Sequence, residues 1–151
     1  MTKEILVAIT GLQFDNSSEA ETEEIKTIHA GEYYQKGDTH YVMFEEQEEN
    51  TQEATSNLLK IKEGFVSLTK KGLVNVVMQF EKGKKSMTSY NTPYGNILMG
   101  MDTHLVEMTK EEEHMKVEIR YALEVNYEYL TDCTINIDVY SKEKGSEIFR
   151  P

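Results

Sequence analysis

Apolar and polar residues alternate along several segments of this chain, and the alternation predicts β-strands. In segment 115–125 the apolar positions are Met115, Val117, Ile119, Tyr121, Leu123 and Val125, with charged residues and one alanine between them. A strand points successive side chains to opposite faces, whereas a helix would scatter these residues around its circumference. Segments 74–80, 133–139 and, less regularly, 59–70 repeat the pattern. The lysines that interleave with apolar positions in the last of these segments are Lys60, Lys62 and Lys70.

Turn-forming residues divide the chain at close and even intervals. Such clusters lie at 15–18, 36–38, 63–64, 71–72, 81–84, 92–95, 126–128 and 142–145. Strands separated in this way are typical of antiparallel sandwiches and barrels. Segment 115–125 is longer than the usual strand of about 5–6 residues, and long strands favour a tilted, closed barrel. We therefore predict an all-β fold, a single antiparallel lipocalin-like β-barrel of about eight to ten strands over residues 1–151. A two-sheet sandwich is the alternative.

Little helix is expected. Segment 109–114 starts with a threonine that can cap a helix and continues with acidic residues that suit a first helical turn. A charged connection between two strands explains the same residues equally well. Segment 19–26 has the same two interpretations.

Composition narrows the range of functions. The chain has 151 residues, with 16 basic and 27 acidic side chains and a formal net charge of −11. Nucleic acids and anionic membrane surfaces are recognised mainly through Lys and Arg, so neither is an expected partner. No apolar run approaches the roughly 20 residues that span a bilayer, and no signal peptide is evident at the amino terminus. Cys133 is the single cysteine, which rules out an intrachain disulfide and makes a cytoplasmic location the default expectation.

The residue types that usually carry catalysis or bind metals form no strong motif. The four histidines are His29, His40, His104 and His114, and none has the spacing of a metalloprotease helix or a zinc site. Asp102 and His104 would share a strand face, which is a weak indication of a site. Cys133 falls on an apolar face and is expected to be a buried, inert thiol. Gly100 is expected to mark a bulge or bend. We expect no metal, no cofactor and no catalytic residue that can be named.

Methionines and one polar loop are the better candidates for a binding site. The methionines in predicted strands are Met43, Met78, Met87, Met99, Met101 and Met115. Methionine fills core gaps but also lines surfaces that accept varied apolar ligands, and the large inward residues favour a filled interior over a cavity. Segment 89–96 combines tyrosines and hydroxyls with a turn set by proline and glycine. It either packs over one barrel end or forms a polar mouth that orients a ligand. The candidate ligand-binding residues are Tyr90, Thr92, Tyr94, Met99, Met101 and Tyr121.

The order of these features resembles the YwiB-like family of uncharacterised bacterial β-barrel proteins, a domain of unknown function. The matching segments are 31–34, 41–46, 55–61, 90–95 and 121–123, and Tyr90-Asn91-Thr92-Pro93-Tyr94-Gly95 is the most specific. The resemblance implies a calycin-type barrel, similar to lipocalins and fatty-acid-binding proteins, and carries no established activity or ligand. One departure is Lys71-Gly72, where an arginine is expected before the glycine, and lysine weakens any bidentate anion-binding role there.

Three functions compete at this point. The first is a barrel that binds a small, mostly apolar ligand near Tyr90, Thr92 and Tyr94. The second is a filled barrel that acts through its surface as a protein-interaction module, with an exposed apolar patch or unpaired edge near 42–44 and a partner that the sequence does not identify. The third and least favoured is a hydrolase or isomerase that uses Tyr94 with Glu45 at the barrel mouth.

Overall fold

The computed structural model describes residues 3–11, 26–47, 53–72, 75–92 and 95–149. The strands are β1 (Glu4–Thr10), β2 (Lys26–Lys36), β3 (Thr39–Gln47), β4 (Ala54–Lys62), β5 (Phe65–Lys71), β6 (Val76–Glu81), β7 (Lys85–Thr92), β8 (Gly95–Lys110), β9 (His114–Val125) and β10 (Glu128–Ser141). One helix, α1 (Lys142–Ile148), follows the last strand. All pairs of neighbouring strands in the sheet are antiparallel. The all-β prediction is therefore confirmed, at the upper end of the expected strand number.

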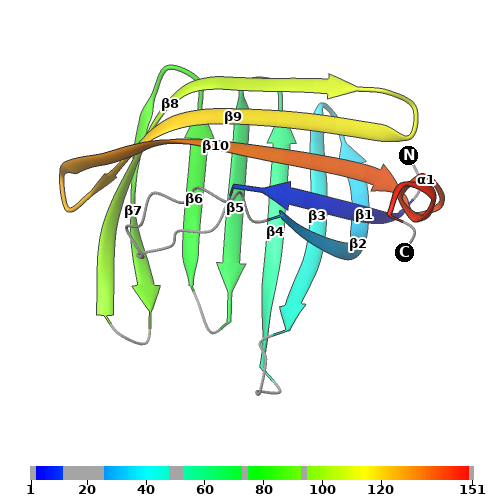
Figure 1. Cartoon of the computed structure of the whole chain (residues 1–151), viewed down its shortest axis with the longest axis horizontal. Coiled ribbons are helices and arrows are strands. Elements are labelled where there is room, and N and C mark those ends of the chain that lie inside the picture. The colour runs from blue at the N-terminus through cyan, green and yellow to red at the C-terminus, as the bar shows by residue number, and fades with distance from the viewer. Residues whose placement is uncertain (1–2, 12–25, 48–52, 73–74, 93–94, 150–151) are drawn as a thin grey trace.

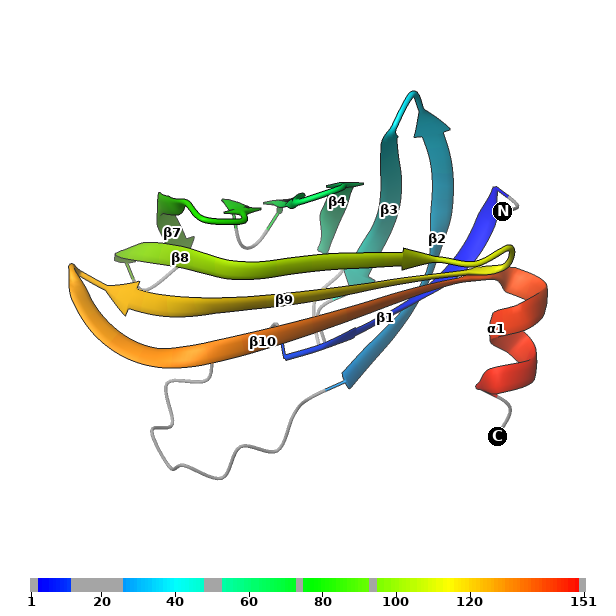
Figure 2. The same ribbon diagram turned by 90° about the horizontal axis from the view of Figure 1, so that it is seen from above.

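The ten strands form a single sheet that curls into a nearly closed barrel. Its order is β6-β5-β4-β3-β2-β1-β10-β9-β8-β7, so β1 joins the two halves by pairing with both β2 and β10. Within the described residues, the two edges of the sheet meet at a bridge between Asn75, which precedes β6, and Asn91 of β7, where the amide of Asn91 donates to the carbonyl of Asn75. In Figure 1, β8, β9, β10 and β1 run across β3 to β6, and Figure 2 shows the two layers facing each other.

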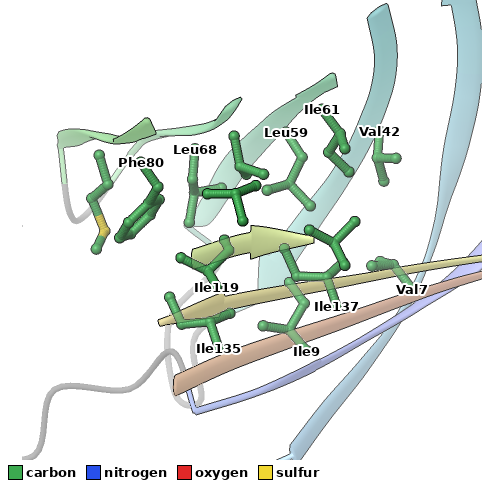
Figure 3. Packing of buried hydrophobic residues seen from close by; sticks show 14 of the residues in the cluster. Val7, Ile9, Val42, Leu59, Ile61, Leu68, Phe80, Ile119, Ile135 and Ile137 are labelled. Carbon is green, nitrogen blue, oxygen red and sulfur yellow. The ribbon is translucent and has the colours of Figure 1, made fainter. Parts of the chain in front are cut away.

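Side chains from both layers fill the space between them. Figure 3 shows Val42, Leu59, Ile61, Leu68 and Phe80 of the first layer pointing at the second. The facing residues are Val7, Ile9, Ile119, Ile135 and Ile137. All ten are buried and belong to one hydrophobic cluster. The alternation read from the sequence thus separates the inner face from the outer face as predicted.

Two local predictions were wrong. Residues 142–145 form the start of α1 rather than a turn, because Ser141 caps the helix by accepting a hydrogen bond from the Lys144 amide at 3.2 Å. Gly100 lies in regular strand, and the register shift of β8 falls between Thr103 and Leu105 instead. A Cβ at position 100 would lie 2.8 Å from the sulfur of Met87, a flexible side chain that can move aside.

Segment 109–114, for which a helical turn was one interpretation, ends β8 and begins β9, and residues 111–113 connect the two strands. The helix α1 has seven residues. No helix in the described part of the chain is long and apolar enough to cross a membrane.

We expect Ile119→Ala to lower the free energy of unfolding by about 2–5 kcal/mol, because it leaves a cavity in a close-packed interior. Ile119 is fully buried. Lys116 lies on the outer face of the same strand, so Lys116→Ala should change stability by no more than about 0.5 kcal/mol. Urea unfolding of both variants measures the difference. Equal effects would contradict the assignment of the two faces.

Candidate functional site

The inner face of β3, β4 and β5 changes from apolar to polar along the strands. Val42, Leu59 and Leu68 lie opposite one another and are buried in the core. The next inner positions toward the 48–52 connection are Phe44, Asn57 and Lys70, followed by Glu46 and Thr55. We call His29, Glu46, Thr55, Asn57 and Lys70 the inner polar cluster.

An ion pair joins two strands within this cluster. The Lys70 ammonium lies 2.5 Å from a carboxylate oxygen of Glu46, and both side chains are largely buried. Burial by itself raises the pKa of Glu46, but the Lys70 ammonium and the Asn57 amide hold it below its ordinary value. Glu46 is therefore ionised at neutral pH, and its charge balances that of the Lys70 ammonium.

His29 lies beside this pair. Its ring stacks on Phe44 with centroids 4.6 Å apart. Burial lowers the pKa of His29 and Lys70 lowers it further, while Glu46 acts in the opposite direction. His29 is therefore neutral at pH 7, and the cluster as a whole carries no net charge.

Two polar atoms of the cluster have no hydrogen-bond partner among the residues that the structure describes. The Asn57 side-chain nitrogen donates to the Thr55 carbonyl at 3.2 Å, but its oxygen Oδ1 has no donor. Thr55 Oγ1 is also without a partner. Both residues are only 3% exposed. Leaving a buried polar group unpaired costs about 1–3 kcal/mol, so these atoms are expected to meet either an ordered water or a ligand group.

A second pair of buried hydroxyls lies in the core between β8 and β9. Thr103 and Tyr121 are opposite each other, fully buried, and neither hydroxyl has a well-aligned hydrogen bond. The Tyr121 ring packs on Phe80 with centroids 4.9 Å apart. Burial raises the pKa of Tyr121 and of its neighbour on β10, Cys133, so both stay protonated. This agrees with the expectation that Cys133 is unreactive, although its side chain is only partly buried.

Most of the ligand-binding residues predicted from the sequence lie in or against the hydrophobic core. Met99, Met101 and Tyr121 are buried members of the core, and Tyr90 packs against the same cluster. Thr92 ends β7, with its side chain outside the described residues, as is all of Tyr94. Met99 and Met101 therefore act as core in the described structure, and a role for these residues in ligand binding stays a prediction.

Three of the four histidines lie outside the inner polar cluster. His40 Nδ1 lies 2.7 Å from the Tyr33 hydroxyl inside the barrel. His114 Nε2 on β9 lies 2.8 Å from Asp138 Oδ1 on the neighbouring strand β10. His104 is the extra residue at the shift in β8 and is exposed. Among the described residues, no group of three or more His, Cys, Asp or Glu side chains could hold a metal ion.

The predicted surface site near 42–44 was wrong. β3 is paired on both sides, and Val42 and Phe44 point into the core because they alternate with outward residues. Glu45 is one of those outward residues. It therefore lies on the outside of the barrel wall. The carboxylate that the predicted Tyr94–Glu45 pair needs is not at the mouth of the barrel.

A groove of about 630 Å³ lies against the outer face of β2 to β5. Its walls are formed by Ala30, Gly31, Glu32, Met43, Phe44, Glu45, Ser56, Asn57, Leu58, Thr69 and Lys71, most of which point outward. Nothing in the sequence pattern indicated that the sheet is hollowed there. The groove is open to solvent, and its charged side chains are exposed.

Comparisons with known proteins support the fold. The model of the family described as "Domain of unknown function (DUF1934)" matches residues 7–137. A solved structure, the crystal structure of the ywiB protein from Bacillus subtilis, matches with a TM-score of 0.73 and 18% sequence identity over 92% of each chain. No curated protein matches this chain. At this identity the structural likeness shows a shared fold and carries no information on a ligand.

The lowered pKa of Glu46 predicts a specific dependence of stability on pH. The unfolded chain has the ordinary pKa of 4.5, so it takes up the proton first as the pH falls. The stabilisation from Glu46 is complete above that value and is lost as the pH falls through the lower folded pKa. The free energy of unfolding, measured in urea from pH 7 to about pH 3, should therefore fall less steeply for Glu46→Gln than for the unaltered protein.

Glu45→Gln is the matched control, because Glu45 is next in sequence and exposed on the opposite face. Its pH dependence should follow that of the unaltered protein. If Glu46→Gln does so too, the Glu46–Lys70 pair does not exist in solution.

Proposed function

The chain belongs to the DUF1934 family, a domain of unknown function, and from that premise we propose that it is a cytoplasmic, lipocalin-like (calycin) barrel that binds a small, mostly apolar molecule. The ligand lies with a polar group on the inner polar cluster and its apolar body against the neighbouring core side chains. Neither nucleic acid nor membrane is a partner in this proposal, and no cofactor is needed.

The two unpartnered atoms Thr55 Oγ1 and Asn57 Oδ1 carry the proposal. They belong to residues that are almost fully buried, on the inner face, at the end of the strands where the apolar core stops. Folded proteins pair nearly all such atoms. A ligand group that pairs with both atoms would remove their cost, which gives binding free energy and orientation together.

The charge of the cluster indicates what kind of polar group fits. Lys70 is neutralised by Glu46, so it offers no free cation to a carboxylate or phosphate. Asn57 Oδ1 needs a donor, and the Thr55 hydroxyl can donate or accept. An uncharged group with an O–H or N–H, such as an alcohol or amide, satisfies both atoms.

The outer groove is a weaker candidate for the same function. Its charged residues Glu32, Glu45 and Lys71 are exposed to water, so a ligand must displace water from groups that are already solvated. The inner polar cluster instead has groups that water reaches poorly. Hydrogen bonds that a ligand forms inside the barrel therefore contribute more to binding than those it forms in the groove.

Catalysis has little support from this geometry. The cluster contains a neutral imidazole and a compensated ion pair, but no Ser or Cys nucleophile stands next to a base among its residues. Binding is the function that its chemistry favours.

We expect the protein to bind N-phenyl-1-naphthylamine, a neutral apolar probe with an N–H donor whose fluorescence rises in apolar surroundings. Thr55→Val removes the unpartnered hydroxyl at constant shape and should weaken binding by about 5- to 30-fold, the equivalent of about 1–2 kcal/mol. The stability of the ligand-free protein should be unchanged or higher, because the hydroxyl has no partner to lose. Fluorescence titration and thermal unfolding give the two values.

Ser56→Ala is the matched control on the same strand, since Ser56 points outward, and it should leave the affinity unchanged. Met43→Ser alters the outer groove and should do the same. No binding of the probe, or an affinity that depends on Met43 and not on Thr55, contradicts the proposal.

A further inference from the structure

The end of the β9–β10 hairpin presents three large apolar side chains to solvent. Tyr127 is 76% exposed, and Tyr129 and Leu130 are each 61% exposed. These are the highest values among the exposed large hydrophobic residues of the described chain. We call residues 126–130 the hairpin tip. It projects beyond the other strands at the left of Figures 1 and 2.

The turn of the hairpin tip places a tyrosine in a backbone conformation that tyrosine does not favour. Asn126 and Tyr127 have φ angles of 50° and 70°, in the left-handed region where two-residue hairpin turns prefer Asn followed by Gly. Asparagine tolerates this conformation, but a bulky tyrosine is unusual there. The Tyr127 side chain gains no burial in return. Residues held in sparsely populated conformations cluster at functional sites, which makes Tyr127 a candidate for a binding role.

Leu130 is exposed for a separate structural reason. The register between β9 and β10 shifts between Tyr129 and Thr131, so Leu130 is the extra residue of a bulge. Bulges change the direction of a side chain, and this one leaves a leucine in solvent beside two tyrosines. Regular pairing would have placed alternate residues of this segment on the inner face.

The hairpin tip is also held in a defined position. The Asn126 amide donates to the Leu98 carbonyl at 2.8 Å, and Asn126 Oδ1 accepts a hydrogen bond from the Leu98 amide at 3.4 Å. These contacts fix the turn to β8. A surface that is fixed in advance loses little conformational entropy on binding, and tyrosines are enriched among the residues that dominate interface energies.

Acidic side chains at the hairpin tip indicate which kind of partner it can bind. Glu128 lies between the two tyrosines with an exposed carboxylate that has no ion pair among the described residues, and Asp132 follows on the same strand. Anionic lipid would be repelled by these groups. A second copy docking tip to tip would bring the like charges together. We propose that the hairpin tip docks into an apolar pocket, rimmed by Lys or Arg, on a different protein.

The test places the photoreactive residue p-benzoylphenylalanine at position 130 of the full chain, in cells of its native host, and irradiates them. We expect an adduct with one other polypeptide, linked within a segment that contains apolar residues and Lys or Arg. Either Tyr127→Gly or Tyr129→Ser should reduce the yield by about tenfold or more, as expected for residues that dominate an interface. Because glycine suits the turn, Tyr127→Gly should also raise the thermal midpoint or leave it unchanged, which shows that the fold is intact.

The control carries the same photoreactive residue at position 77, since Val77 is 46% exposed on β6. The proposal is overturned if position 77 gives the same adduct or if both substitutions leave the yield unchanged. Adducts only with a second copy of the chain or only with lipid overturn it in favour of those partners. The absence of any adduct overturns it as well.

Discussion

The alternation of inner and outer side chains is the constraint on which the rest of this structure depends. The ten antiparallel strands form one sheet in which β1 pairs with β2 on one side and β10 on the other, and its edge strands β6 and β7 meet at the Asn75–Asn91 bridge. Once each strand has a register, every second residue must enter the interior. The apolar majority of those residues forms the core, and the same rule carries Glu46, Thr55, Asn57 and Lys70 inside with them.

Sequence reasoning predicted the parts of the fold that depend on alternation alone. The alternation in 115–125 and 133–139 correctly predicted which residues of β9 and β10 face the interior. The turn between these strands was predicted at 126–128. Lys70 and Glu46 were missed as inner residues because both are charged, and only the register of β3, β4 and β5 shows that they face inward and meet. Tyr94 and the side chain of Thr92 lie outside the described residues, so the loop predicted as the barrel mouth stays a prediction.

One of the two proposed sites lies inside the barrel and the other lies on its surface. The inner polar cluster offers buried atoms that need partners, in surroundings where hydrogen bonds are strong. The hairpin tip has apolar side chains that are exposed to water. Its turn has a backbone conformation that suits glycine better than tyrosine. Both are places where the sequence departs from what stability alone favours, and such departures are expected at functional sites.

The most direct test of ligand binding at the inner polar cluster is a crystal structure of the protein purified under native conditions from its own host, at a resolution that separates water from ligand. We expect connected density of a small organic molecule within hydrogen-bond distance of Thr55 Oγ1 and Asn57 Oδ1. Isolated spherical waters on both atoms, or side chains that have turned to pair with each other, would contradict it.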